Sequence, residues 1–217
     1  MKPTGTVTFL FADIVGASFI GDRRSPAGEA GTSYLGAVIT DVIVRNHGIV
    51  YWSSGFRYCC AFVLPLDAVI AANQIQSRLG SAISNTDSAI FRMAVHTGEA
   101  QESEGHYSGL TVNRVLQLLS MARPGEVLAS SSVEKLVMDF LPEDLQFTEL
   151  LHRELPNRDR ILQLRKQLDT PAVEVPFRAA RYADAQSRFK VAYRQPRSRV
   201  SYVRRRASRA PAIALLS

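Results

Sequence analysis

The sequence has few cysteines and no long apolar run. Of its 217 residues only Cys59 and Cys60 are cysteines, and they are adjacent in an apolar segment. Because neighbours on a strand point to opposite faces, we expect two buried reduced thiols and no disulfide between them. No apolar stretch is long enough for a transmembrane helix. The N-terminal residues show no signal-peptide pattern, so we expect a cytoplasmic protein.

Acidic residues are scarce toward the end of the chain. Residues 176–217 hold 11 of the 26 Lys and Arg residues but only one of the 20 Asp and Glu residues, Asp184. This asymmetry predicts a folded domain over residues 1–170 and a basic, disordered tail over residues 171–217. The alternative function for the tail is an electrostatic arm that binds nucleic acid or an anionic membrane.

The apolar pattern of the body mixes strands and helices. Two strands around Ser53-Ser54-Gly55 are typical of a β-hairpin, and we expect a turn at Thr97-Gly98 and a loop or hairpin tip over residues 101–109. The order of elements predicts an α+β fold with helices packed on a sheet, a group that includes the ferredoxin-like core. Strands are expected at 6–11, 49–52, 56–63, 88–96, 127–129, 147–151 and 161–164, and helices at 33–46, 66–79, 111–121 and 131–140.

Four segments carry a family pattern. They are residues 5–16 (GTVTFLFADIVG), residues 47–62 (HGIV followed by GF and AF), residues 95–114 (VHTGEA, YSG and VNR) and residues 123–130 (RPGEVLAS). In this order and spacing they resemble the class III adenylyl/guanylyl cyclase homology domain over about residues 5–164. The wording is closest to cyclase domains of actinobacterial LuxR-type regulators.

The resemblance implies a fold, a reaction and a partner. The fold is the ferredoxin-like cyclase fold, with a central, mostly antiparallel sheet and helices packed on it. Two chains pair head to tail, as a homodimer or as a heterodimer with another cyclase domain, and ATP or GTP binds between them. The family converts ATP to cyclic AMP and pyrophosphate with two Mg²⁺ or Mn²⁺ ions, which stabilise the attacking and leaving oxygens.

The metal positions of the family fall on three residues of this sequence. Asp13 matches the first metal aspartate, and Ile14 would offer a backbone carbonyl. The second metal aspartate is replaced by Ser54, whose neutral hydroxyl is a poor ligand for a hard dication. The alternative role for Asp13, an acid at the end of a strand, is to cap a turn.

The base-reading and catalytic positions are also changed. Val50 replaces a lysine and His106 replaces an aspartate, both of which read the base in the family. Asn113 matches the catalytic asparagine, and Gln117 replaces an arginine that faces the reacting phosphate; residues four apart share a helix face. The alternatives are that His106 is an exposed loop histidine and that Asn113 caps a helix.

These replacements leave three hypotheses for the function. The first is a working or weakly working nucleotide cyclase, a phosphorus–oxygen lyase of cyclic nucleotide signalling. The second is a pseudo-cyclase that dimerises or senses nucleotides, because Asp13 and Asn113 survive from opposite halves of the site. The third is a remnant of a larger transcriptional regulator, suggested by the change of charge near Pro176. The sequence leaves open whether any turnover remains.

Overall fold

The computed structural model describes residues 2–14, 26–54, 56–82, 91–155 and 159–167. The basic tail expected over residues 171–217 lies outside these residues, and the domain boundary near residue 170 stays a prediction. Within the described residues, no helix is both long enough and apolar enough to cross a membrane.

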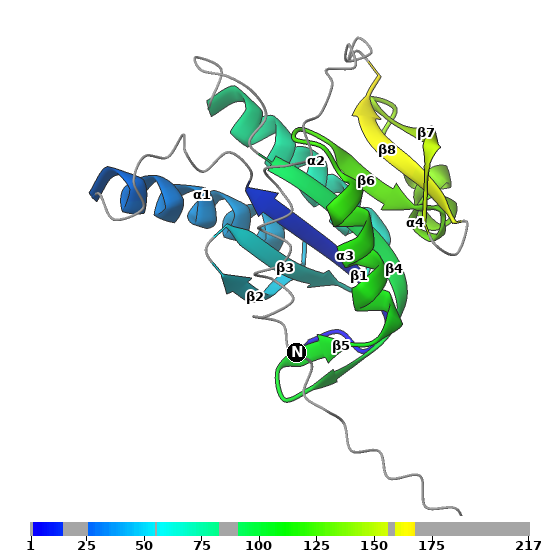
Figure 1. The fold of residues 1–217 in the computed structure, drawn as a ribbon, viewed down its shortest axis with the longest axis horizontal. Coiled ribbons are helices and arrows are strands. Elements are labelled where there is room, and N and C mark those ends of the chain that lie inside the picture. Colours follow the sequence, from blue (N-terminus) through cyan, green and yellow to red (C-terminus); the bar gives the residue numbers. More distant parts are fainter. Residues whose placement is uncertain (1, 15–25, 55, 83–90, 156–158, 168–217) are drawn as a thin grey trace, which may run out of the picture. The chain divides into compact units, whose positions relative to one another are not determined.

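One eight-stranded sheet forms the centre of the fold (Figure 1). Strands follow the order β2-β3-β1-β4-β6-β8-β7, and β5 pairs with β4 outside this path. The pairing of β4 with β6 is parallel and the other pairings are antiparallel. The strands are β1 (Gly5–Ile14), β2 (Ile49–Ser54), β3 (Arg57–Phe62), β4 (Phe91–Ser103), β5 (His106–Ser108), β6 (Val127–Ser130), β7 (Leu145–Glu154) and β8 (Arg160–Lys166). This arrangement confirms the α+β fold and the mostly antiparallel sheet.

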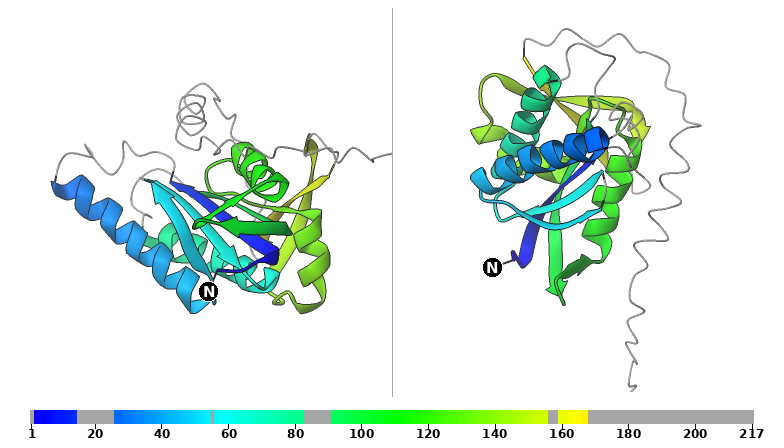
Figure 2. Two further views of the ribbon diagram at one scale, coloured as in Figure 1. Left: turned by 90° about the horizontal axis from the view of Figure 1, so that it is seen from below. Right: turned by 90° about the vertical axis from the view of Figure 1, so that its left-hand side faces the viewer.

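Helices cover the two faces of the sheet unequally. The main apolar core lies between the sheet and the helices α1, α2 and α4, whose buried residues share one cluster with Leu10, Ala12 and Ile14 of β1. Helix α3 lies on the opposite face (Figure 2). The helices are α1 (Pro26–Arg45), α2 (Pro65–Ala82), α3 (Leu110–Met121) and α4 (Ser131–Val137), and the short 3₁₀ helix η2 (Met138–Phe140) continues α4.

The alternation of β1 decides what faces α3. Because successive side chains of a strand point to opposite faces, Phe9, Phe11 and Asp13 lie on the face away from the main core. The ring of Tyr107 packs edge-on against Phe9 at a centroid distance of 5.0 Å and against Tyr51 at 4.8 Å. The sheet face that carries α3 is therefore aromatic around Phe9 and Tyr107 and carries the charged side chain of Asp13 near the end of β1.

The turn expected at Thr97-Gly98 is wrong, because β4 runs through both residues. Gly98 instead makes room for α3: a Cβ atom there would lie 2.8 Å from the Thr111 hydroxyl oxygen. That hydroxyl donates a 2.5 Å hydrogen bond to the carbonyl of Glu99. The loop or hairpin tip expected over residues 101–109 is the β4–β5 hairpin, with Glu104 and Gly105 at positive φ.

Helix α1 ends at Arg45, one residue before the predicted end at residue 46. His47 holds the left-handed conformation, at φ 58°, and the Gly48 amide donates to the Ile43 carbonyl at 2.8 Å, as in a Schellman motif. Gly48 is required for space, since a Cβ atom there would lie 2.3 Å from the Phe62 ring. Cys59 and Cys60 are both free and buried, as expected.

Candidate functional site

Four residues form a row across the sheet at the end of β1. Strand register pairs Ser54 of β2 with Arg57 of β3, Arg57 with Asp13 of β1, and Asp13 with Arg92 of β4. Residues directly opposite one another on neighbouring strands share a face, so their side chains can interact. The row therefore surrounds Asp13 with two arginines that lie 44 and 79 residues away in the sequence.

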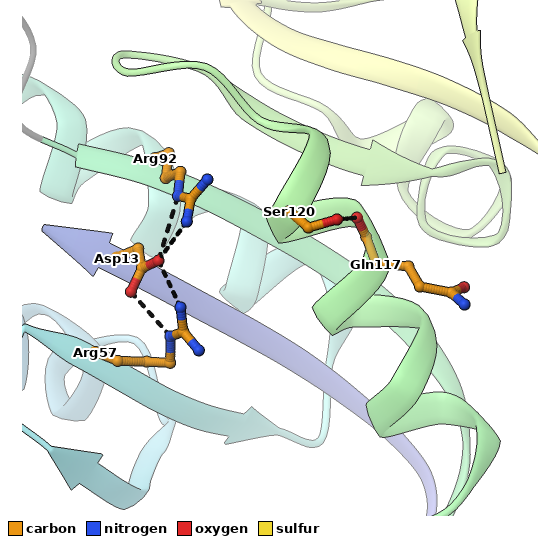
Figure 3. Close-up of polar contacts among 5 residues, drawn as sticks. All are labelled: Asp13, Arg57, Arg92, Gln117 and Ser120. Atoms are coloured by element: carbon orange, nitrogen blue, oxygen red, sulfur yellow. Dashed lines mark hydrogen bonds and ion pairs between the residues drawn. The ribbon is translucent and has the colours of Figure 1, made fainter. Parts of the chain in front are cut away.

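Both carboxylate oxygens of Asp13 are engaged by arginine (Figure 3). Arg57 donates in a fork, from Nε to Oδ1 at 2.8 Å and from Nη2 to Oδ2 at 2.6 Å. Arg92 donates to Oδ2 from Nη2 at 2.7 Å and from Nε at 3.2 Å. Charge-assisted, two-pronged bonds of this kind are among the strongest polar contacts in proteins. The carboxylate of Asp13 thus faces two arginines.

The cluster is largely removed from water. The side chains of Asp13 and Arg57 are 10% and 12% exposed, and that of Arg92 is 2% exposed. Buried charges persist only when they are paired and hydrogen-bonded. Asp13, Arg57 and Arg92 therefore each depend on the others for charge compensation, and the Asp13 carboxylate is already engaged by both arginines.

The other two positions expected at a metal site are Ile14 at the end of β1 and Ser54 at the end of β2. The amide of Ile14 donates a 2.8 Å hydrogen bond to the carbonyl of Phe56 and its side chain is buried. Ser54 is exposed at the end of β2. Across the part of the chain that the structure describes, no three His, Cys, Asp or Glu side chains gather to hold a metal ion.

The residues present do not fit the divalent ions that the resemblance implies. Mg²⁺ requires about six oxygen ligands in near-octahedral geometry. Here the candidate carboxylate belongs to Asp13, whose two oxygens already accept hydrogen bonds from Arg57 and Arg92. A dication at this place would also meet two like-charged guanidinium groups, which oppose its binding. No step of a reaction is therefore routed through a metal at Asp13.

The two positions expected to read the base lie apart from this row. Val50 is opposite Cys60 on β3 and packs against the main core beneath the helices, on the other face from Asp13. His106 is the first residue of β5 and is exposed. The alternative of an exposed histidine thus fits the position of His106, which lies in a strand and not in a loop.

Asn113 and Gln117 lie on the exposed side of α3. Both side chains are exposed and one helical turn apart, as their spacing predicts. Asn113 is the fourth residue of α3 and its amide donates to the carbonyl of Gly109, the N-cap residue, so Asn113 does not cap the helix. Figure 3 shows the Gln117 side chain directed away from the Asp13 cluster. Asp13 and Gln117 of one chain therefore do not face each other. A site formed by both residues would have to combine Asp13 of one chain with Gln117 of another.

Arg57 and Arg92 are the site residues that sequence reasoning missed. A signal was present, because Arg92 interrupts the apolar strand Phe91–Val95 and a charged residue in a buried strand needs a buried partner. The identity of that partner depends on strand register, which the local pattern does not give.

A buried histidine lies on the same side of β4 as Arg92. Nδ1 of His96 is 2.8 Å from the Ser130 hydroxyl, which is 2.8 Å from the Ser132 hydroxyl. Burial, the largest cause, and the nearby Arg114 guanidinium together lower the pKa of His96 to about 4, against an opposing effect of Asp159. His96 is therefore a neutral side chain at physiological pH, and its place in a closed hydroxyl network gives it a structural role.

The geometry defines the class III adenylyl/guanylyl cyclase fold. The crystal structure of an adenylate/guanylate cyclase/hydrolase from Silicibacter pomeroyi matches with a TM-score of 0.63 and 21% identity, covering 75% of this chain and 97% of that one. The non-canonical dimeric guanylyl cyclase domain of the RhoGC fusion protein from the aquatic fungus Blastocladiella emersonii matches with a TM-score of 0.57 and 16% identity, covering 76% of this chain and 97% of that one. At these identities the similarity establishes the fold.

A sequence relative is found in mycobacteria. The uncharacterized protein Rv0891c of Mycobacterium tuberculosis is 28% identical over 169 residues, which cover 76% of this chain and 57% of the relative. The chain thus spans little more than half the length of this curated relative. No protein-family model matches the sequence.

Proposed function

We propose that this chain is a cyclase homology domain of cyclic nucleotide signalling that has lost turnover and acts as a dimerising, nucleotide-sensing pseudo-cyclase. The observation that carries the proposal is the charge at six positions: Asp13, Val50, Ser54, His106, Asn113 and Gln117 include one carboxylate and no lysine or arginine. The reaction of the family needs carboxylates that bind the metal ions and a cationic side chain that faces the triphosphate, and these six positions supply one carboxylate and no such cation.

The expected loss of rate is large. Removing one donor that stabilises the transition state typically costs about 10² to 10³ in rate. Here a metal carboxylate is replaced by Ser54 and a phosphate-facing guanidinium by Gln117. Such effects are not additive, but both act on the same reacting phosphate, so we expect turnover below detection.

The nucleotide-sensing role follows from what is retained. Asn113 remains exposed on α3, and the fold that brings two chains together in this class is intact over β1 to β8. We propose a homodimer or a heterodimer with another cyclase domain, located in the cytoplasm, with ATP or GTP bound between the chains. The basic segment over residues 171–217 is a further contact for nucleic acid in this proposal.

The test uses the purified full chain. We expect no cyclic AMP or cyclic GMP above a protein-free blank when ATP or GTP is supplied with Mg²⁺ or Mn²⁺, and a dimer by light scattering. Robust formation of either cyclic nucleotide would restore the hypothesis of a working cyclase. A chain that stays monomeric at every concentration tested, with and without nucleotide, would reject the dimerising module.

The competing hypothesis of a remnant of a larger transcriptional regulator depends on the charge change near Pro176. It predicts that residues 171–217 can be removed without loss of fold stability or of dimer formation. A truncated chain ending at residue 170 and compared with the full chain by thermal unfolding and light scattering separates these outcomes. A large loss on truncation would argue against a remnant.

A further inference from the structure

We propose that Arg57 is an internal cation that stands in the position of the divalent metal and excludes Mg²⁺ and Mn²⁺ from Asp13. This inference rests on the proposed function in one respect, the descent of Asp13 and Ser54 from metal ligands. It concerns a residue, Arg57, to which the resemblance assigns no role.

The register of three strands places Arg57 between the two ligand positions. On one side Arg57 is directly opposite Asp13 of β1, and on the other it is directly opposite Ser54 of β2. Because directly opposed residues share a face, the Arg57 side chain emerges between those of Ser54 and Asp13. A cation shared by these two positions would have to occupy the region that Arg57 spans.

The contacts show that Arg57 takes up the ligand capacity of Asp13. The Arg57 guanidinium donates hydrogen bonds to both carboxylate oxygens of Asp13, at 2.8 and 2.6 Å, so each oxygen already accepts a hydrogen bond. The planar fork of arginine matches a carboxylate in this two-pronged way, and a metal would have to displace it. Arg92 adds a second guanidinium at 2.7 Å from Oδ2, from the side of β4.

The burial of the group makes displacement costly. Arg57 is 12% exposed and Arg92 is 2% exposed, so neither guanidinium can leave Asp13 without losing a charge partner in a poorly solvated place. The repulsion between a dication and these groups is also screened less here than at the surface. Both effects favour arginine over metal at Asp13.

A pair of variants tests this with Mn²⁺ alone, followed by the electron paramagnetic resonance signal of the free ion. In wild type we expect no binding in the millimolar range that depends on Asp13. Arg57→Met should gain a Mn²⁺ site with a Kd at least about tenfold lower than any wild-type binding. The gain should disappear in Arg57→Met/Asp13→Asn.

Arg45→Met is the matched control. Arg45 also bonds to an aspartate, Asp41, at 2.7 Å, but this pair is exposed on α1. The substitution removes the same charge from the chain and leaves the Asp13 cluster intact, so we expect no gain of Mn²⁺ binding. An equal gain in Arg45→Met and Arg57→Met would overturn the proposal by showing a general charge effect.

A measurement on the wild-type chain does not depend on the folding of any variant. Mn²⁺ broadens the amide NMR signals of residues close to it. We expect no selective broadening at Asp13, Arg57 and Arg92. Selective broadening there would overturn this inference while leaving a chain without turnover unaffected. If the chain formed cyclic nucleotide but showed no such broadening, the proposed function would be rejected and the inference about Arg57 would stand.

Discussion

His96 of β4 and Ser130 of β6 are joined by a 2.8 Å contact between Nδ1 and the hydroxyl oxygen, and both side chains are buried. Burial, the largest cause, and Arg114 lower the pKa of His96 to about 4 from its ordinary 6.5. Between these values the His96 imidazole binds a proton in the unfolded chain but not in the folded chain. The contribution of neutral His96 to the free energy of unfolding is therefore fully present above about pH 6.5 and is lost as pH falls toward 4. The loss should reach up to about 3 kcal/mol.

This pH dependence is measured by urea unfolding of wild type and His96→Gln across that range. The difference between their unfolding free energies should shrink as pH falls, because the variant has no imidazole to titrate. His106→Gln, at an exposed histidine, is the control and should follow wild type at each pH. A pH-independent difference between wild type and His96→Gln would contradict the assignment.

The ion pairs of Asp13 should make it a stability residue. In Asp13→Asn, Arg57 and the buried Arg92 lose their anionic partner, and breaking a buried pair in this way costs about 3–5 kcal/mol. Asp41→Asn is matched in chemistry, since Asp41 bonds to Arg45 and Arg78, but its pairs are exposed. Denaturant unfolding should show a large loss for Asp13→Asn and almost none for Asp41→Asn.

Gly48 should not tolerate a side chain. Its Cβ would lie 2.3 Å from Cε1 of the buried Phe62 ring, and overpacking of this kind costs about 1–3 kcal/mol. A double-mutant cycle with Phe62→Leu checks the cause. Gly48→Ala should be less destabilising in the Phe62→Leu background than in wild type, and equal costs in both would place the strain elsewhere.

The hydroxyl of Tyr107 ties the β4–β5 hairpin to the N-terminal segment. It donates a 2.6 Å hydrogen bond to the carbonyl of Pro3, and its ring packs against Phe9 and Tyr51. Tyr107→Phe keeps the ring contacts and should cost about 1 kcal/mol, whereas Tyr107→Ala should cost about 3–5 kcal/mol. Thermal unfolding of the two variants separates the hydroxyl from the ring.

Repair of the catalytic positions should fail while Arg57 remains. In Ser54→Asp/Gln117→Arg the new carboxylate would stand opposite Arg57, which would bind it as it binds Asp13. Adding Arg57→Leu removes that cation, and only this triple variant should gain Mn²⁺-dependent cyclic nucleotide formation in a product assay. Val50 is left unchanged because it packs against the core, where a lysine would bury a charge. Turnover by the double variant would show that Arg57 is no obstacle.

Much of the fold could be predicted from local pattern. A local sequence signal marks each of three elements: the apolar run of β1, the turn residues of the hairpin around residues 53–55, and the helical spacing of the apolar residues in α3. The predicted strands, hairpin and helix were therefore confirmed, with shifted ends. The predicted turn at Thr97-Gly98 was wrong because a Thr-Gly pair is a turn signal only on average. In β4 the tertiary structure uses Gly98 to let Thr111 of α3 approach the strand.

The residue types at the candidate positions follow from the sequence alone: the aspartate Asp13, the asparagine Asn113, and neutral side chains at Ser54 and Gln117. The surroundings of Asp13 depend on how the strands pair in the folded sheet. Arg57 and Arg92 are 44 and 79 residues from Asp13, and they reach it because the register of β3 and β4 against β1 places them directly opposite. Register is set by packing of whole strands against the core, so no local pattern around Asp13 contains it.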